Sequence, residues 1–214
     1  MKKDFVKIIS LLSIAAIIFA ALSFFYKSKS EDSANPQTSS ANKILIRDWS
    51  PRQGPAMAKV QVVEFLDPEC ESCRAMHPIV KRVLSKFENK ILFVVRYMPF
   101  HKNSKLAASW LEAARIQGKY WQALDLLFAR QPQWASHHNP RPELIPPFLQ
   151  LIGVDIAKAK VDIKKQDISD NLDQDQKDGL ELGVNGTPTF FVNGRMLERL
   201  SEAGLIAMIE AELE

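Results

Sequence analysis

Cysteine is scarce in this chain, whose 214 residues include only Cys70 and Cys73. A small fold stapled by disulfides would carry more cysteines at wider spacing, so that class is excluded. The formal net charge is only +3, and no basic stripe interleaved with aromatic residues occurs, which argues against nucleic acid as a partner. Repeats and low-complexity tracts are also lacking. The composition, with 46% hydrophobic and 25% charged residues, is that of an ordinary globular protein.

A long apolar run lies near the N-terminus. Residues 8–25 are apolar except for three serines, and lysines stand on both sides of them. A membrane-spanning helix needs about 17–25 such residues, whereas the apolar part of a signal peptide has about 7–15. We expect residues 1–26 to be a signal anchor that tethers the chain to the inner membrane, with a cleaved signal peptide as the alternative. Residues 27–42 are polar and predict a flexible tether.

Residues 43–214 begin with alternating strand and helix patterns. Residues 44–49 are interpreted as a short leading strand, and residues 60–66, rich in valine, as a stronger one. Apolar residues then recur at helical spacing beyond Cys70. The apolar run 91–98 is typical of a strand that is buried on both faces. These patterns predict a βαβ unit.

The second half contains a helical block at about 104–183, followed by two strands and a helix. The helical patterns in this block cover residues 106–116, 120–129, 144–152 and 155–182. Residues 189–192 then predict a strand, Asn193-Gly194 predicts a hairpin turn, and Ser201 is a suitable N-cap for a last helix. The order βαβ, helices, ββα indicates an α/β fold with a helical insertion between its two halves.

The two cysteines lie at the junction between the predicted strand 60–66 and the helix that follows it. Residues three apart on a helix are neighbours, so this C-x-x-C pair can open and close a disulfide. Backbone N–H groups and the helix dipole favour a thiolate at the first position. We therefore expect Cys70 to attack and the more buried Cys73 to resolve the mixed disulfide.

Two other interpretations of the cysteine pair stay open. One is an inert structural disulfide. The other is a zinc or copper site, with His77 as a third ligand on the same helix face. The chain has only four histidines and no second C-x-x-C, so a complete metal site is not predicted. The other three histidines lie in loop-like sequence and are assigned no role.

Glu64 is a carboxyl group on an apolar strand face. Val60, Val62, Glu64 and Leu66 alternate onto one side of the strand. Burial among valines should raise the pKa of this carboxyl, which could then relay a proton during disulfide exchange. An ordinary role, in which Glu64 meets water or pairs with a lysine, is the alternative.

The segment Gly186-Thr187-Pro188-Thr189 leads into an apolar strand. Proline has no N–H group to donate to a neighbouring strand, so it is expected at the first position of a strand. A tight turn is also the usual place for a cis X-Pro bond. We expect a cis Thr187–Pro188 peptide that faces the cysteines and leaves the Thr187 backbone free to pair with an extended substrate.

In combination, these motifs resemble the DsbA-like branch of the thioredoxin superfamily over residues 50–214. The similarity includes Gly54-Pro55, Val63-Glu64-Phe65, Cys70-Glu71-Ser72-Cys73 and Tyr97-Met98-Pro99-Phe100, together with the long motif 186–194. The resemblance implies a thioredoxin-like fold, a redox pair Cys70–Cys73, a buried acid at Glu64, and a cis-proline at Pro188 with Thr187 binding substrate.

The resemblance also implies a thiol–disulfide oxidoreductase of the periplasm or cell envelope. It should oxidise exported polypeptides, need no organic cofactor, and depend on a membrane redox partner for recycling. Disulfide reductase or isomerase activity is the alternative within the same fold. DsbA-like oxidases often carry Pro-His between the cysteines, whereas this chain has Glu71-Ser72. The charges of Glu69 and Glu71, which are expected to be solvated, should disfavour the Cys70 thiolate and make the protein a milder oxidant. Arg74 should favour the Cys70 thiolate.

Overall fold

The computed structural model describes residues 44–214. The predicted anchor at 8–25 and the tether at 27–42 lie outside the described residues. Within the described part, no helix is long and apolar enough to cross a membrane.

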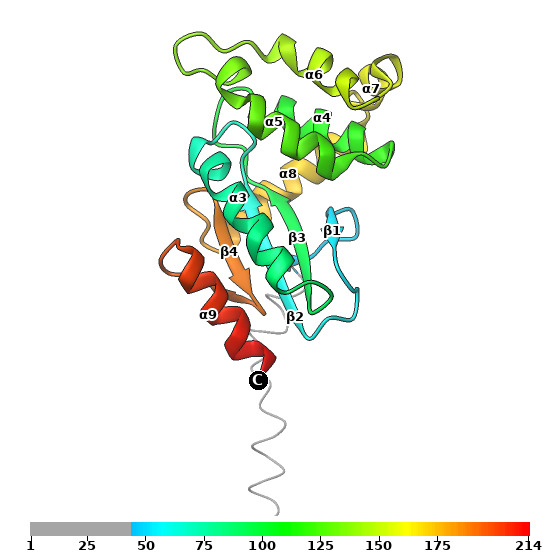
Figure 1. The fold of residues 1–214 in the computed structure, drawn as a ribbon. Helices are drawn as coiled ribbons and strands as arrows, with labels where there is room; N and C mark the ends of the chain where they lie inside the picture. Colours follow the sequence, from blue (N-terminus) through cyan, green and yellow to red (C-terminus); the bar gives the residue numbers. More distant parts are fainter. Residues whose placement is uncertain (1–43) are drawn as a thin grey trace, which may run out of the picture. The chain divides into compact units, whose positions relative to one another are not determined.

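A mixed five-stranded sheet in the order β1-β3-β2-β4-β5 forms the centre of the fold (Figure 1). The central strands β2 (Val60–Leu66) and β3 (Ile91–Tyr97) are parallel, with Glu64 opposite Val95. The other pairings are antiparallel and involve β1 (Arg52–Gln53), β4 (Thr189–Val192) and β5 (Arg195–Met196). The predicted strands at 60–66, 91–98 and 189–192 are thereby confirmed.

Strand β2 presents alternate residues to two separate apolar clusters. Val60, Val62 and Leu66 join the cluster that includes α3 (Glu71–Lys86) and α9 (Glu202–Leu213). Val63 and Phe65 join a second cluster on the opposite face of the sheet. Glu64 shares the parity of the first set, so its carboxyl faces the α3 layer.

The helical insertion lies between β3 and β4, as predicted. Its elements are α4 (Ser104–Ile116), α5 (Tyr120–Trp134), the 3-10 turn η1 (Pro142–Leu144), α6 (Ile145–Leu151), α7 (Ile156–Asp162) and α8 (Gln166–Glu181). Helices α4 to α7 gather at one end of the sheet, and α8 returns the chain toward β3 (Figure 1). Helix α5 contacts α3, which places the insertion beside the start of the cysteine helix.

The predicted leading strand at 44–49 is wrong, because residues 44–45 are helical and residues 48–49 form a turn. The first strand is instead Arg52–Gln53. Side chains rather than a strand ladder hold the segment. The guanidinium of Arg96 donates to the Leu45 carbonyl at 3.0 Å, and the Trp49 indole donates to Asp175 at 2.9 Å.

Two helix boundaries also differ from the predicted ones. The single helix expected over 155–182 is broken at 163–165, because α7 packs against α4 and α6 whereas α8 packs against α4 and β3. Helix α5 continues past the predicted end at residue 129 and through Pro132. Its last turn is held by buried Trp134, whose indole donates to the Leu127 carbonyl at 2.9 Å.

The signals near the C-terminus are confirmed. Asn193 and Gly194 both have positive φ, 44° and 83°, as a tight hairpin turn of the primed type requires. The Ser201 hydroxyl accepts a hydrogen bond from the Gly204 N–H at 3.1 Å and caps α9.

Candidate active site

Cys70 is the N-cap residue of α3, on the turn that connects β2 to this helix. Its N–H donates to the Asp67 carbonyl at 3.1 Å. The buried amide of Gln131, from α5, donates to the carbonyls of Pro68 and Cys70, both at 2.9 Å. The helical insertion therefore holds the turn that carries the first cysteine.

The peptide between Thr187 and Pro188 is cis, as expected, and faces Cys70. The Cys70 thiol lies 3.3 Å from the Thr187 carbonyl oxygen and can donate to it. The structure thus brings together two segments that are 117 residues apart in the sequence. A cleft of about 290 Å³ lies beside this loop and is lined in part by Met196 and Leu200.

The two thiols have opposite electrostatic environments. A hydrogen bond from Cys73 lowers the pKa of Cys70 to about 5 against the effect of burial, and the Thr187 side chain and the N–H groups of Ser72 and Cys73 contribute. Burial raises the pKa of Cys73 well above that of an ordinary thiol, and the charges of Glu64 and Cys70 add to the effect. This asymmetry matches an attacking Cys70 and a resolving Cys73.

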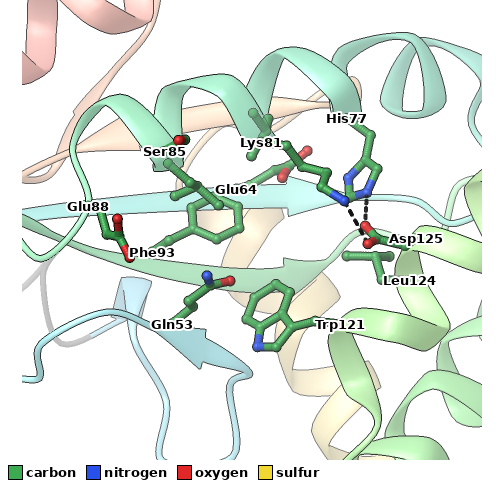
Figure 2. Close-up of a pocket in the computed structure, with 12 residues that line it drawn as sticks. Gln53, Glu64, His77, Lys81, Ser85, Glu88, Phe93, Trp121, Leu124 and Asp125 are labelled. Atoms are coloured by element: carbon green, nitrogen blue, oxygen red, sulfur yellow. Dashed lines mark hydrogen bonds and ion pairs between the residues drawn. The ribbon is translucent and has the colours of Figure 1, made fainter.

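Glu64 lies beneath the cysteine helix and is only 3% exposed. Burial raises its pKa to about 8, in agreement with the sequence prediction, so the carboxyl is largely protonated at neutral pH. Glu64 lines a cleft of about 380 Å³. Figure 2 shows it with other residues of the lining, among them Phe93 and Trp121. A buried acid therefore forms part of the lining of this cleft.

His77 lies at the same cleft but is engaged elsewhere. Its Nε2 atom is 2.6 Å from the Asp125 carboxylate, which also binds Lys81 at 2.7 Å (Figure 2). Across residues 44–214, no group of three or more histidine, cysteine, aspartate or glutamate side chains is arranged to hold a metal ion. The geometry does not favour the copper or zinc module built on Cys70, Cys73 and His77.

The carboxylates that flank Cys70 differ from each other. Glu69 was expected to be solvated, but it is buried at 6% exposure and accepts hydrogen bonds from the backbone and side-chain amides of Asn103 at 2.6 and 2.9 Å. These bonds form because α4 begins against the turn. Glu71 is exposed, as expected, and its carboxylate is 3.4 Å from the Nε2 atom of His137. Arg74 is exposed as well.

Three site residues were missed by sequence reasoning: Asp67, His101 and Gln131. The carboxylate of Asp67 is fully buried and binds His101, and Gln131 supports the Cys70 turn. A local signal existed only for Asp67, as an Asp-Pro pair after a strand. The other two reach the turn from distant elements, and nothing in their own neighbourhoods in the sequence marks them.

Comparisons with known proteins agree with this site. The sequence matches the family model described as Thioredoxin over residues 48–211. Among solved structures, BdbD from Bacillus subtilis superposes with a TM-score of 0.70 at 24% identity, covering 77% of this chain and 93% of that one. The α-DsbA1 protein of Wolbachia pipientis gives a TM-score of 0.72 at 17% identity, covering 81% and 95%. At these identities the two structures show the shared fold.

A curated relative has a different name. The chain is 32% identical over 160 residues to the Na(+)/H(+) antiporter NhaA of Herminiimonas arsenicoxydans. The matched region covers 74% of this chain and 25% of that protein. The chain thus spans about a quarter of the length of the curated relatives it matches. The family model, the shared fold and the geometry of the cysteine pair agree. This chain belongs to the thioredoxin family that the matching model describes, and it shares the fold of BdbD and α-DsbA1.

Proposed function

We propose that this protein oxidises thiols of exported polypeptides through the Cys70–Cys73 pair. The observation that carries the proposal is the placement of Cys70, which is at the start of α3, faces the Thr187 carbonyl, and has its pKa lowered to about 5. Cys73 lies beneath it, fully buried above the protonated carboxyl of Glu64. The arrangement supplies a good leaving thiolate at Cys70 and a proton donor below it.

In the first step, a substrate thiolate attacks the Cys70 sulfur of the enzyme disulfide. The Cys70–Cys73 bond breaks, a mixed disulfide forms, and Cys73 leaves as a thiolate. This thiolate is unstable because it is buried, so it takes the proton of Glu64. The cleft of Figure 2 then lets Glu64 regain a proton from solvent.

In the second step, another substrate thiolate attacks the substrate sulfur of the mixed disulfide. Cys70 leaves as a thiolate, and the substrate gains a disulfide. Two electrons have passed from the substrate to the enzyme, which is now a dithiol. The Thr187 backbone and the cleft beside it, which includes Met196 and Leu200, form the surface proposed to bind an extended substrate.

The oxidising direction is favoured by the pKa of Cys70. A dithiol whose first thiol ionises easily is stabilised, so the disulfide form gives up its bond readily. Reductase or isomerase activity, the alternative for this fold, would need the opposite balance.

The deciding experiment is the equilibrium of the protein with glutathione, read by trapping free thiols. A potential near −120 to −150 mV supports an oxidase, whereas one below about −250 mV reverses the direction. Absence of exchange rejects the oxidoreductase function altogether. As matched variants, Cys73→Ser and Cys70→Ser are first incubated with oxidised glutathione. Cys73→Ser, carrying glutathione on Cys70, should exchange it for a reduced unfolded polypeptide, releasing the glutathione thiol and accumulating the mixed disulfide, and Cys70→Ser should not.

The proposal places the protein in the cell envelope, where exported substrates occur. Residues 8–25 would anchor it, and a membrane redox partner able to accept two electrons would reoxidise the dithiol. Membrane fractionation with mass analysis of the mature N-terminus tests the anchor against the cleaved signal peptide. Recovery in the soluble fraction with residues 1–26 removed would establish cleavage.

A further inference from the structure

His101 lies in the connection between β3 and α4 and contacts the turn that carries Cys70. Its ring Nδ1 atom is 2.7 Å from the Asp67 Oδ2 atom, and its backbone N–H donates to the same oxygen at 3.2 Å. Asp67 is fully buried, whereas the His101 side chain is 33% exposed. Among residues 44–214, His101 is the only potentially cationic side chain paired with Asp67. A buried carboxylate in this position favours the charged imidazolium.

The Asp67 carboxylate also fixes the geometry between His101 and the cysteine turn. Its oxygens accept hydrogen bonds from the N–H groups of Glu69 and Phe100, both at 2.8 Å, and from the Ser104 hydroxyl. The Asp67 carbonyl accepts the Cys70 N–H. One residue thus joins the histidine to the turn before α3.

The charges around His101 come from three segments. Asp67, Glu69 and the Cys70 thiolate lie on the turn, and all three act on His101 as negative charges. From the segment after α5, the His137 ring lies 6.0 Å away between centroids, and His137 in turn contacts Glu71 on α3. Burial lowers the pKa of His101, but the bond to Asp67 and these negative charges outweigh it and raise the pKa above its ordinary value.

We propose that His101, oriented by Asp67, is the cationic side chain that stabilises the Cys70 thiolate across the turn. Glu71-Ser72, the pair between the two cysteines, offers no cation for this purpose. His101 is a positioning residue, because it acts on the charge of Cys70 and forms no bond with substrate. Its role in turnover rests on the function proposed above, but the coupling of the two charges exists whether or not the protein turns over.

Because of thermodynamic linkage, the coupling can be measured either as a change in the His101 pKa or as a change in the Cys70 pKa. If the imidazolium favours the thiolate, the thiolate must favour the imidazolium by the same factor. Oxidation to the disulfide removes the thiolate charge. His101 should therefore bind its proton about threefold to tenfold more tightly in the dithiol form than in the disulfide form, as expected for a partly exposed charge pair.

The experiment is an NMR titration of the full chain labelled with ¹³C-histidine, in detergent micelles, in both redox states. The signal lost in His101→Gln assigns the residue. We expect the His101 pKa to be higher by about 0.5–1 in the dithiol form than in the disulfide form. An unchanged His101 pKa would overturn the proposal without the need for any variant to fold.

The reciprocal measurement follows the alkylation rate of Cys70 against pH. His101→Gln should raise the apparent Cys70 pKa by the same 0.5–1, and the control His138→Gln should not. A His101→Gln protein that loses stability while the Cys70 pKa stays constant would mean a structural role and would reject the proposal. Coupled titration without glutathione exchange would reject the oxidase function alone.

Discussion

Replacing Glu64 by glutamine should make the stability of the protein less dependent on pH. The pKa of Glu64, about 8, lies far above its ordinary value of 4.5. Between these two values the native carboxyl holds a proton that the unfolded chain has already released. The stabilisation from the neutral buried group is therefore complete below pH 4.5 and is lost as the pH rises toward 8. Glutamine has nearly the same shape and no proton to release in this range.

The magnitude follows from the width of this pH window. Each pH unit changes the free energy of unfolding by about 1.4 kcal/mol, so the whole window amounts to on the order of 5 kcal/mol. The free energy of unfolding of Glu64→Gln, relative to that of the wild type, should therefore increase steadily from pH 5 to pH 8. All other titrating groups are common to both proteins and cancel in the difference.

The assay is urea denaturation at pH 5, 6, 7 and 8, performed on the disulfide form so that neither thiol titrates. Glu181→Gln, an exposed substitution at the end of α8, is the control and should stay within about 0.5 kcal/mol of the wild type throughout. If the Glu64→Gln and wild-type profiles run parallel, Glu64 is not a neutral buried acid, and its assignment as proton donor to the resolving thiolate fails.

Three further outcomes test the site and its support. Alkylation of the reduced protein by iodoacetamide should show an inflection near pH 5 as Cys70 ionises, with its partner thiol unreactive; equal labelling of both would contradict the asymmetry. Gln131→Ala should lower the free energy of unfolding by about 1–3 kcal/mol, because two buried carbonyls lose their donor, whereas exposed Gln133→Ala should change it by less than about 0.5 kcal/mol. Arg96→Ala should cost about 3–5 kcal/mol, since buried Asp175 loses its ion-pair partner and buried Asp178 keeps only Arg47. Arg195→Ala, in its exposed ion pair, should cost less than about 1 kcal/mol. Both stability tests use urea denaturation, and equal losses in a variant and its control would refute the role assigned to burial.

Local patterns were sufficient where the determining physics is local. Alternation along 60–66 placed Glu64 on the same apolar face as Val60, Val62 and Leu66, and its burial raises its pKa as predicted. Asn193-Gly194 specified the hairpin because both residues tolerate positive φ. The position of Cys70 at a strand–helix junction was likewise readable, because apolar periodicity changes from two to about 3.6 there.

Tertiary structure decided the features whose partners are distant in the chain. Gln131 is 61 residues from the Cys70 carbonyl it binds, and His101 reaches Asp67 from the connection after β3. The segment at 44–49 had the composition of a strand, but the buried charge of Arg96 takes its carbonyls as acceptors. A local window contains no information about such partners, because buried hydrogen-bonding groups pair with whatever polar group the fold brings within reach. The sequence alone therefore identified the candidate cysteine pair and the acidic residue on the strand before it, and only the tertiary structure determined which side chains hold the turn between them.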